Sequence, residues 1–131
     1  MRKNIKYLVI LTFLFLFPLM VFAARFHTVT AVNGAIASTL NAGDLPKGWQ
    51  LESVKLHLSA AGGAGSFTIT VDANAGATYD VVIFTQDMTT STDVLWIPER
   101  PVILRNGDKL IFAYTNANNR AYGLEVGWNS L

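Results

Sequence analysis

The chain contains no cysteine. Its absence excludes disulfide bonds, a thiolate nucleophile and a lipid-attached cysteine behind a leader peptide. Stability must therefore come from packing. A domain of about 100 residues buries roughly 60 to 70% of the surface of its unfolded chain, which is sufficient for one sandwich-type core.

Charged residues are also few, at 15% of 131 residues. Three of the ten basic residues, Arg2, Lys3 and Lys6, stand near the N-terminus, so residues 24–131 carry 7 basic and 9 acidic residues, a formal charge of −2. No basic stripe follows along the chain. Binding to nucleic acid is therefore not expected.

One long apolar run, residues 8–24, follows these basic residues. Small residues at Val21 and Ala23 suit secretory cleavage, so we expect a signal peptide over residues 1–23 and one domain over residues 24–131. The alternative is a retained N-terminal membrane anchor, although the run has only 17 residues where a span needs about 20. Either way the domain is expected to be exported, with membrane contact only through residues 1–23.

Beyond the leader, no window combines a helical apolar stripe with a start cap and a stop, so little or no helix is expected. Apolar residues instead alternate with polar ones, as in half-buried strands. In Trp49–Leu58, one face carries Val54, Leu56 and Leu58 while Lys55 and His57 face the other way. In Ser66–Asp72, one face carries Phe67, Ile69 and Val71.

Two runs, Tyr79–Thr85 and Asp93–Pro98, are apolar on both faces. This pattern is typical of central strands or of strands that contact another layer. Pro98 and Pro101 bracket two charged residues, and proline cannot donate to a β-ladder, so this segment is predicted to cross between sheets or lie at an edge.

The remaining strands are expected around turn signals. Asn106-Gly107 is the strongest hairpin signal, between Pro101–Arg105 and Asp108–Thr115. A final strand covers Ala121–Trp128, with Tyr122, Leu124, Val126 and Trp128 on one face. Weaker candidates are Arg25–Val32 and Gly34–Leu40, separated by Asn33-Gly34, which could form another tight turn.

About seven to nine short strands with these spacings predict an all-β fold: a single antiparallel β-sandwich behind the N-terminal hydrophobic segment. Immunoglobulin-like and jelly-roll connections are both allowed. The jelly-roll-like order is preferred.

Catalytic candidates are weak. His57 lies on the polar face of its strand. A catalytic triad would also need an acid and an oxyanion hole, and no local motif indicates either, so we interpret His57 as a surface histidine. His27 has no neighbouring second ligand and is assigned no role. No phosphate-binding loop or hydrolase elbow occurs in the sequence. We therefore expect no enzyme and no catalytic residues.

The segment Asp72–Gly76 begins like a calcium loop, but Ile83 occupies the twelfth position, where a glutamate is required. A looser site could use Asp72, Asn74 or Asp80, yet a solvated turn shaped by Asn and Gly is favoured. No metal or cofactor is expected.

Aromatic residues raise the alternative of sugar stacking. Trp49, Trp96 and Trp128 are candidates, although filling the core or an interface is the favoured interpretation. The most polar and aromatic cluster surrounds the loop before the last strand and is the predicted ligand or partner surface: Tyr114, Asn116, Asn118, Asn119, Arg120 and Tyr122. The charges around the proline pair are interpreted as solvated or as partner contacts: Glu99, Arg100 and Arg105.

Five short phrases occur in order along residues 51–128: Thr68-Ile69-Thr70, Tyr79-Asp80, Trp96-Ile97-Pro98, Gly107-Asp108 and Tyr122-Gly123-Leu124. In this order they resemble small phage-encoded β-sandwich proteins found among virion genes of tailed and other bacteriophages. The phrases are scaffold features, so the resemblance implies a virion component and transfers no active site. The leader departs from that group and points to a particle that matures at, or contains, a membrane.

The sequence thus predicts a non-enzymatic structural or attachment protein of a virus particle. Its expected partners are further copies of itself or other virion proteins, because repeated contacts multiply a small interface. The alternative is a secreted or cell-surface carbohydrate-binding module of a bacterium, with a surface glycan as its partner.

Overall fold

The computed structural model describes residues 25–31, 34–41 and 48–131. Within these ranges the chain forms strands and one short 3-10 turn, and no α-helix, as expected. The elements are β1 (Arg25–Ala31), β2 (Ile36–Asn41), β3 (Trp49–Leu58), β4 (Ser66–Asp72), η1 (Ala77–Tyr79), β5 (Val81–Asp87), β6 (Asp93–Trp96), β7 (Val102–Leu104), β8 (Lys109–Tyr114) and β9 (Tyr122–Ser130).

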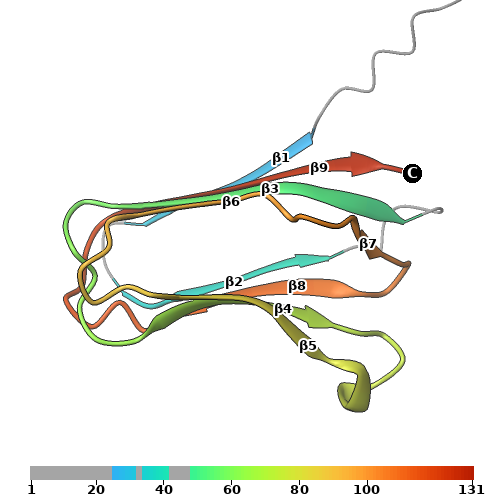
Figure 1. Ribbon diagram of the computed structural model, residues 1–131, viewed down its shortest axis with the longest axis horizontal. Coiled ribbons are helices and arrows are strands. Elements are labelled where there is room, and N and C mark those ends of the chain that lie inside the picture. Colours follow the sequence, from blue (N-terminus) through green and yellow to red (C-terminus); the bar gives the residue numbers. More distant parts are fainter. Residues whose placement is uncertain (1–24, 32–33, 42–47) are drawn as a thin grey trace, which may run out of the picture.

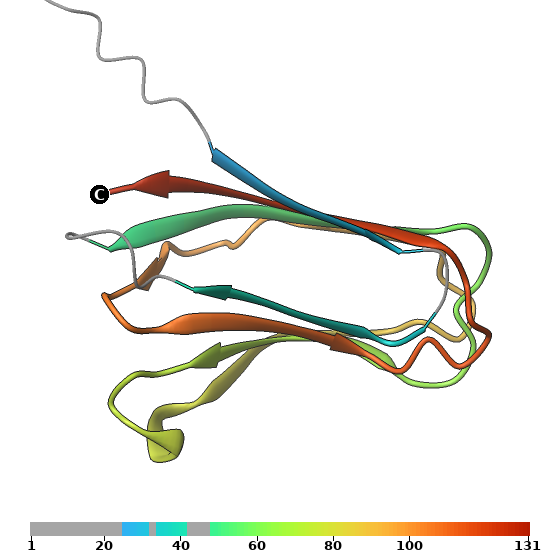
Figure 2. The same cartoon turned by 180° about the vertical axis from the view of Figure 1, so that it is seen from behind.

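The strands form two antiparallel sheets that face each other (Figures 1 and 2). One sheet has the order β1-β9-β3-β6, with β7 also paired to β3, and the other has the order β2-β8-β4-β5. Among the described strands, only β4 and β5 are paired neighbours that also follow each other in the chain. The predicted all-β antiparallel sandwich is confirmed.

Alternation along the strands builds the core between the sheets. The inward residues of β3, β4, β8 and β9 are nearly inaccessible to solvent, whereas Lys55 and His57 on the other face of β3 are exposed. Seventeen hydrophobic residues form the buried cluster: Ile36, Trp49, Leu51, Val54, Leu56, Leu58, Phe67, Ile69, Met88, Val94, Leu104, Leu110, Phe112, Tyr114, Tyr122, Leu124 and Val126.

A bulge in β3 lets both halves of this strand face the core. The register between β3 and β9 shifts between Leu51 and Ser53. Trp49 and Leu51 therefore point inward before the shift, and Val54 points inward after it, although its sequence parity is opposite. On the other side of β3, β7 pairs with residues 49–51 and β6 with residues 54–57, so the Pro98–Pro101 segment spans the same irregularity.

The prediction of a hairpin at Asn106-Gly107 is wrong. A turn does occur there, with a hydrogen bond from Asp108 N to Arg105 O and a φ of 90° at Gly107. However, β7 pairs with β3 in one sheet and β8 pairs with β2 and β4 in the other. A type I′ hairpin turn needs positive φ at both central residues, and Asn106 does not have it. The turn therefore carries the chain between sheets.

A central position for β5 and β6 is likewise not observed, because each forms an edge of its sheet. The outer apolar residues of these strands are exposed, including Val82 at 57% and Leu95 at 69%. The segment 98–101 follows the sheet edge, in agreement with one of its two predicted placements. Asn33 of the predicted Asn33-Gly34 turn lies outside the described residues, but β1 and β2, the strands before and after it, pair in different sheets and form no hairpin.

The predicted leader, residues 1–23, lies outside the described residues, as does the proposed cleavage position. In the part of the chain that is described, no helix is long and apolar enough to cross a membrane.

Truncating an inward residue should test this core. Phe112 is fully buried in β8, so Phe112→Ala is expected to lower the free energy of unfolding by about 3–5 kcal/mol through lost burial and a residual cavity. Thr39→Ala, at an exposed position of the neighbouring β2, should change it by less than about 0.5 kcal/mol. Urea unfolding followed by circular dichroism measures both, and equal losses would contradict the assigned core.

Candidate functional site

Asn116 is the most firmly held residue of the predicted ligand surface. It is 3% exposed and adopts a left-handed φ of 51°. Its Nδ2 donates to the carbonyl oxygens of Gly34 at 2.7 Å and Arg120 at 2.8 Å, and its Oδ1 accepts from Arg120 N at 2.9 Å. The amide is thus used inside the protein to close its own loop and join it to the segment before β2.

The neighbouring residues extend this network across the same end of the sandwich. Asn119 Oδ1 accepts from Gly34 N at 2.6 Å, and Arg120 Nε donates to Ala61 O at 3.1 Å. Asn118 N donates to Gly62 O at 3.2 Å. Three loops that are distant in sequence are therefore fixed against one another, while the Asn118 and Asn119 side chains remain largely exposed.

The two tyrosines of the predicted surface point into the protein. Tyr114 is 3% exposed and Tyr122 is 7% exposed, because alternation in β8 and β9 turns both inward. The Tyr114 hydroxyl donates to Gly63 O at 3.2 Å. Burial raises the pKa of Tyr114, and the negative charge of Asp87 adds to the increase. Neither ring is available for sugar stacking, so the exposed part of this surface is reduced to Asn118, Asn119 and part of Arg120.

Pairing of β3 with β6 gives His57 an acidic partner that its local sequence does not reveal. His57 Nδ1 lies 2.6 Å from Asp93 Oδ1, and the two residues are direct cross-strand neighbours. Asp93 Oδ2 also accepts from Thr92 Oγ1 at 2.5 Å. The Thr92 hydrogen bond and then the His57 interaction hold the pKa of Asp93 below its usual value. Both side chains are about two-thirds exposed, at 71% and 66%, so His57 lies on the outer face as alternation predicts.

The turn considered for a cation has carboxylates that bond to nearby groups of the protein. Asp80 Oδ1 accepts from Ala73 N, and Asp108 Oδ1 accepts from Asn74 N, each at 2.9 Å. Asp72 Oδ2 lies 3.7 Å from Lys109 Nζ. Within residues 25–31, 34–41 and 48–131, no group of three or more His, Cys, Asp or Glu residues could hold a metal ion.

The three tryptophans lie in or against the core. Trp49 is 1% exposed, and its ring centroid is 5.6 Å from that of Trp128. Trp96 is half-buried at the sandwich edge, where its ring centroid is 5.1 Å from that of Phe84 on the facing sheet. The core interpretation is confirmed for Trp49, and the other two pack partly buried against the same cluster.

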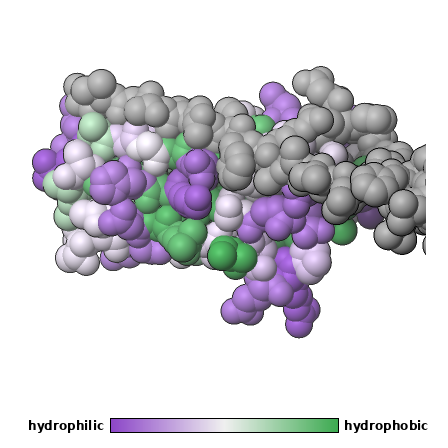
Figure 3. Space-filling view, turned by 90° about the horizontal axis from the view of Figure 1, so that it is seen from above, coloured by the Kyte–Doolittle hydropathy of each residue, from purple (hydrophilic) through white to green (hydrophobic). Residues whose placement is uncertain are grey.

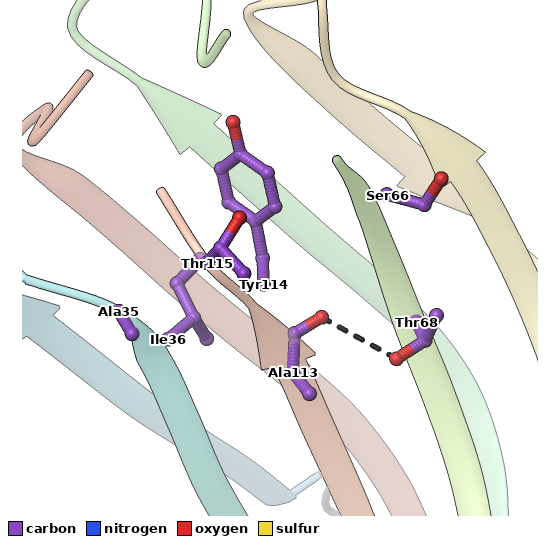
Figure 4. Close-up of a pocket in the computed structure, with 7 residues that line it drawn as sticks. All are labelled: Ala35, Ile36, Ser66, Thr68, Ala113, Tyr114 and Thr115. Atoms are coloured by element: carbon purple, nitrogen blue, oxygen red, sulfur yellow. Dashed lines mark hydrogen bonds between the residues drawn. The ribbon is translucent and has the colours of Figure 1, made fainter. Parts of the chain in front are cut away.

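A shallow hollow of about 260 Å³ lies where β2, β8 and β4 meet (Figure 4). Its lining is small, apolar or hydroxylated: Ala35, Ile36, Ser66, Thr68, Ala113, Tyr114 and Thr115. The Thr68 hydroxyl donates to Ala113 O at 3.4 Å, so one of the polar groups already has a partner in the sheet. No charged residue lines this hollow.

A larger groove, about 420 Å³, lies between the two sheet edges formed by β5 and by the β6–β7 segment. We call this side of the molecule, formed by β5, β6, β7 and the Pro98–Pro101 segment, the open edge. The groove combines an apolar floor with one acidic and one basic residue, and its lining is Ile83, Trp96, Ile97, Pro98, Glu99, Arg100 and Val102. Sequence reasoning named several of these residues separately, but only the pairing of β6 and β7 with β3 places them around one groove.

The strands on both sides of this groove also carry exposed apolar side chains, of which Ile97 lines the groove itself. Those on β5 and the turn before it are Tyr79, Val81 and Val82, and those on or between β6 and β7 are Leu95, Ile97 and Ile103. Each is more than half exposed. Figure 3 looks onto the outer face of the sheet that contains β3 and β6 and shows a hydrophobic area bordered by hydrophilic residues. The open edge is therefore an apolar surface in contact with solvent.

Comparisons with known proteins add little to this geometry. No family model matches the chain, and no curated protein matches it. One solved structure, described as a crystal structure of PirA, is similar with a TM-score of 0.41 and 16% sequence identity, over 79% of this chain and 92% of that one.

The loop network predicts a large effect of Asn116→Ala. We expect a loss of about 2–4 kcal/mol in the free energy of unfolding, because two carbonyl oxygens and one N–H lose their partner in a buried site. Asn116→Gly relieves the left-handed backbone but also removes the amide, so it should recover only part of the loss. Asn118→Ala, in the same loop, serves as the exposed control in urea unfolding. Equal stability of all three variants would contradict the network.

The Asp93 interactions predict a specific pH dependence. Its carboxyl should titrate below 3.8, and Thr92→Val should raise its pKa more than His57→Gln does, because the Thr92 bond has the larger effect. Since the folded-state pKa is depressed, the associated stability is present above the unfolded-state pKa and is lost as pH falls through the folded-state pKa. Carbon-detected NMR titration of the three proteins measures this, and the opposite order would contradict the assigned cause.

Proposed function

We propose that the chain is a non-enzymatic structural or attachment component of a virus particle, a phage virion protein that acts through its outer surfaces and by self-association. One observation carries the proposal. Of the seven large apolar residues that are strongly exposed in the described part of the chain, Leu95, Ile97 and Ile103 form a group on or between β6 and β7, and three more lie on β5 and the turn before it. Scattered exposed apolar residues are normal, whereas a contiguous group marks an interaction surface.

Strand patterning supports the same conclusion. The runs around β5 and β6 are apolar on both faces although each strand is at a sheet edge. Solvent does not favour apolar residues on the outer face, so a contacting protein layer accounts for the pattern better than water does. Repeated use of such a surface in a symmetric assembly would multiply the effect of a small contact.

The strand order supports assigning the sandwich to the jelly-roll type. The chain crosses repeatedly between the sheets, and the order β1-β9-β3-β6 opposite β2-β8-β4-β5 supports an arrangement of two interleaved Greek keys. Capsid and lectin domains both use jelly rolls, so this topology is compatible with the proposal but does not distinguish it from glycan binding. Residues 1–23 would export the domain or anchor it at the membrane.

Glycan binding is retained as a second candidate because one observation favours it. We call the end of the sandwich where the loop of Asn116 meets the segments at Gly34 and Ala61 the loop end. Its exposed amide and hydroxyl side chains include those of Asn118, Asn119 and Thr89, and hydrogen bonds hold the backbone beneath them in place. A rigid polar surface of this kind loses little entropy when it binds hydroxyl groups.

Purified particles test the proposed function. In a density gradient of particles released by cells that express the gene, the chain should sediment with the particle band in many copies and resist a high-salt wash, because apolar contacts are not screened by salt. Mass spectrometry of gradient fractions measures this. Absence from particles would contradict the proposal, and glycan-array binding that Asn118→Ala abolishes would then favour the second candidate.

A further inference from the structure

We propose that the open edge is a two-fold interface at which a second copy of this chain binds. The inference rests on the self-association part of the proposed function and names its surface, its symmetry and the residues that meet. An isologous contact requires a surface that is complementary to itself. The open edge meets this requirement in both shape and charge.

The shape argument starts from Ile97. Its side chain is 64% exposed and also lines the groove of about 420 Å³. Because Ile97 is exposed and also lines the groove, the Ile97 side chain of one copy can enter the groove of the second copy. The Ile97 side chain of the second copy can then enter the groove of the first. Leu95 and Ile103, at 69% and 55% exposure, extend the same apolar surface along β6 and β7.

The charge argument comes from Glu99 and Arg100, which are adjacent, exposed and both at the groove. If a two-fold axis passes between Glu99 and Arg100, the two copies of this segment run in opposite directions. Glu99 of one copy then meets Arg100 of the other, and this contact occurs twice in each dimer. On the outer face of β3, Lys55 is already paired with Glu125 within the chain.

The composition of this edge also suits an interface. A stable interface buries about 800 Å² on each partner, usually with an apolar centre and a polar rim. Ile97 and the Pro98–Pro101 segment, with the neighbouring exposed Leu95 and Ile103, provide apolar groups for such a centre, with Glu99 and Arg100 at its rim. Neither a nucleic acid nor an anionic surface would find an excess of positive charge here.

The test uses protein purified after expression of the full chain, studied by sedimentation equilibrium over about a hundredfold range of concentration. We expect a monomer–dimer equilibrium. Ile97→Lys should raise the dissociation constant at least tenfold, because it places two buried ammonium groups in the interface. Leu131→Lys alters an exposed apolar residue away from the open edge and should leave the constant unchanged within about a factor of two.

Charge reversal separates a specific two-fold contact from general stickiness. Glu99→Arg and Arg100→Glu should each raise the dissociation constant about tenfold, because each creates two like-charge contacts. The double variant restores opposite charges and should return the constant to within about threefold of the original. Circular dichroism confirms that each variant is folded.

Several results would overturn the inference: a monomer at all concentrations, a dimer indifferent to the open-edge variants, or no rescue by the double variant. A monomer whose incorporation into particles still falls in Ile97→Lys would place a different virion protein at the open edge, and would also overturn it. If the chain is absent from particles but dimerises as described, the proposed virion role fails and the interface stands. If it is present in particles with no edge-dependent dimer, the interface fails and the virion role stands.

Discussion

Burial of inward-facing side chains between two sheets is the constraint on which the structure depends. With no cysteine, and with no α-helix in the described residues, the facing apolar layers and the strand ladders must stabilise the domain. β3 is central to this layer, because it pairs with β9 on one side and with both β6 and β7 on the other. Its bulge keeps Trp49 and Val54 in the same core, and the break between β6 and β7 stands opposite that bulge.

The loop end and the open edge relate to this core in different ways. At the loop end, polar side chains hydrogen-bond to the backbone and hold the loops together. Asn116 is almost completely buried, and its amide joins the segment before β2 to the loop before β9. Along the open edge, apolar side chains remain exposed to solvent and are not part of the core between the sheets. The first arrangement stabilises the monomer, whereas the second leaves burial to be gained on contact with another molecule.

The open edge also explains why both-face apolar runs were ambiguous. Such a pattern indicates that both faces of a strand are covered, but it does not state whether the cover comes from the same chain. In β5 and β6 the inner face contacts the core through Phe84 and Trp96, and the outer face has no covering layer among the described residues. Interpreting these strands as central was therefore wrong, while the alternative of a contact strand agrees with the proposed interface.

The sequence by itself determined the strands and their inward faces, because alternation at a period of two is a local property that burial on one side imposes. Val54, Phe67 and Leu124 could be assigned to the core in this way. Only the tertiary structure decided which strands are neighbours, since pairing depends on contacts between distant segments. It placed the Asn106-Gly107 turn between the sheets and Asp93 beside His57. It also brought Trp96, Glu99 and Arg100 together with Ile83 around one groove.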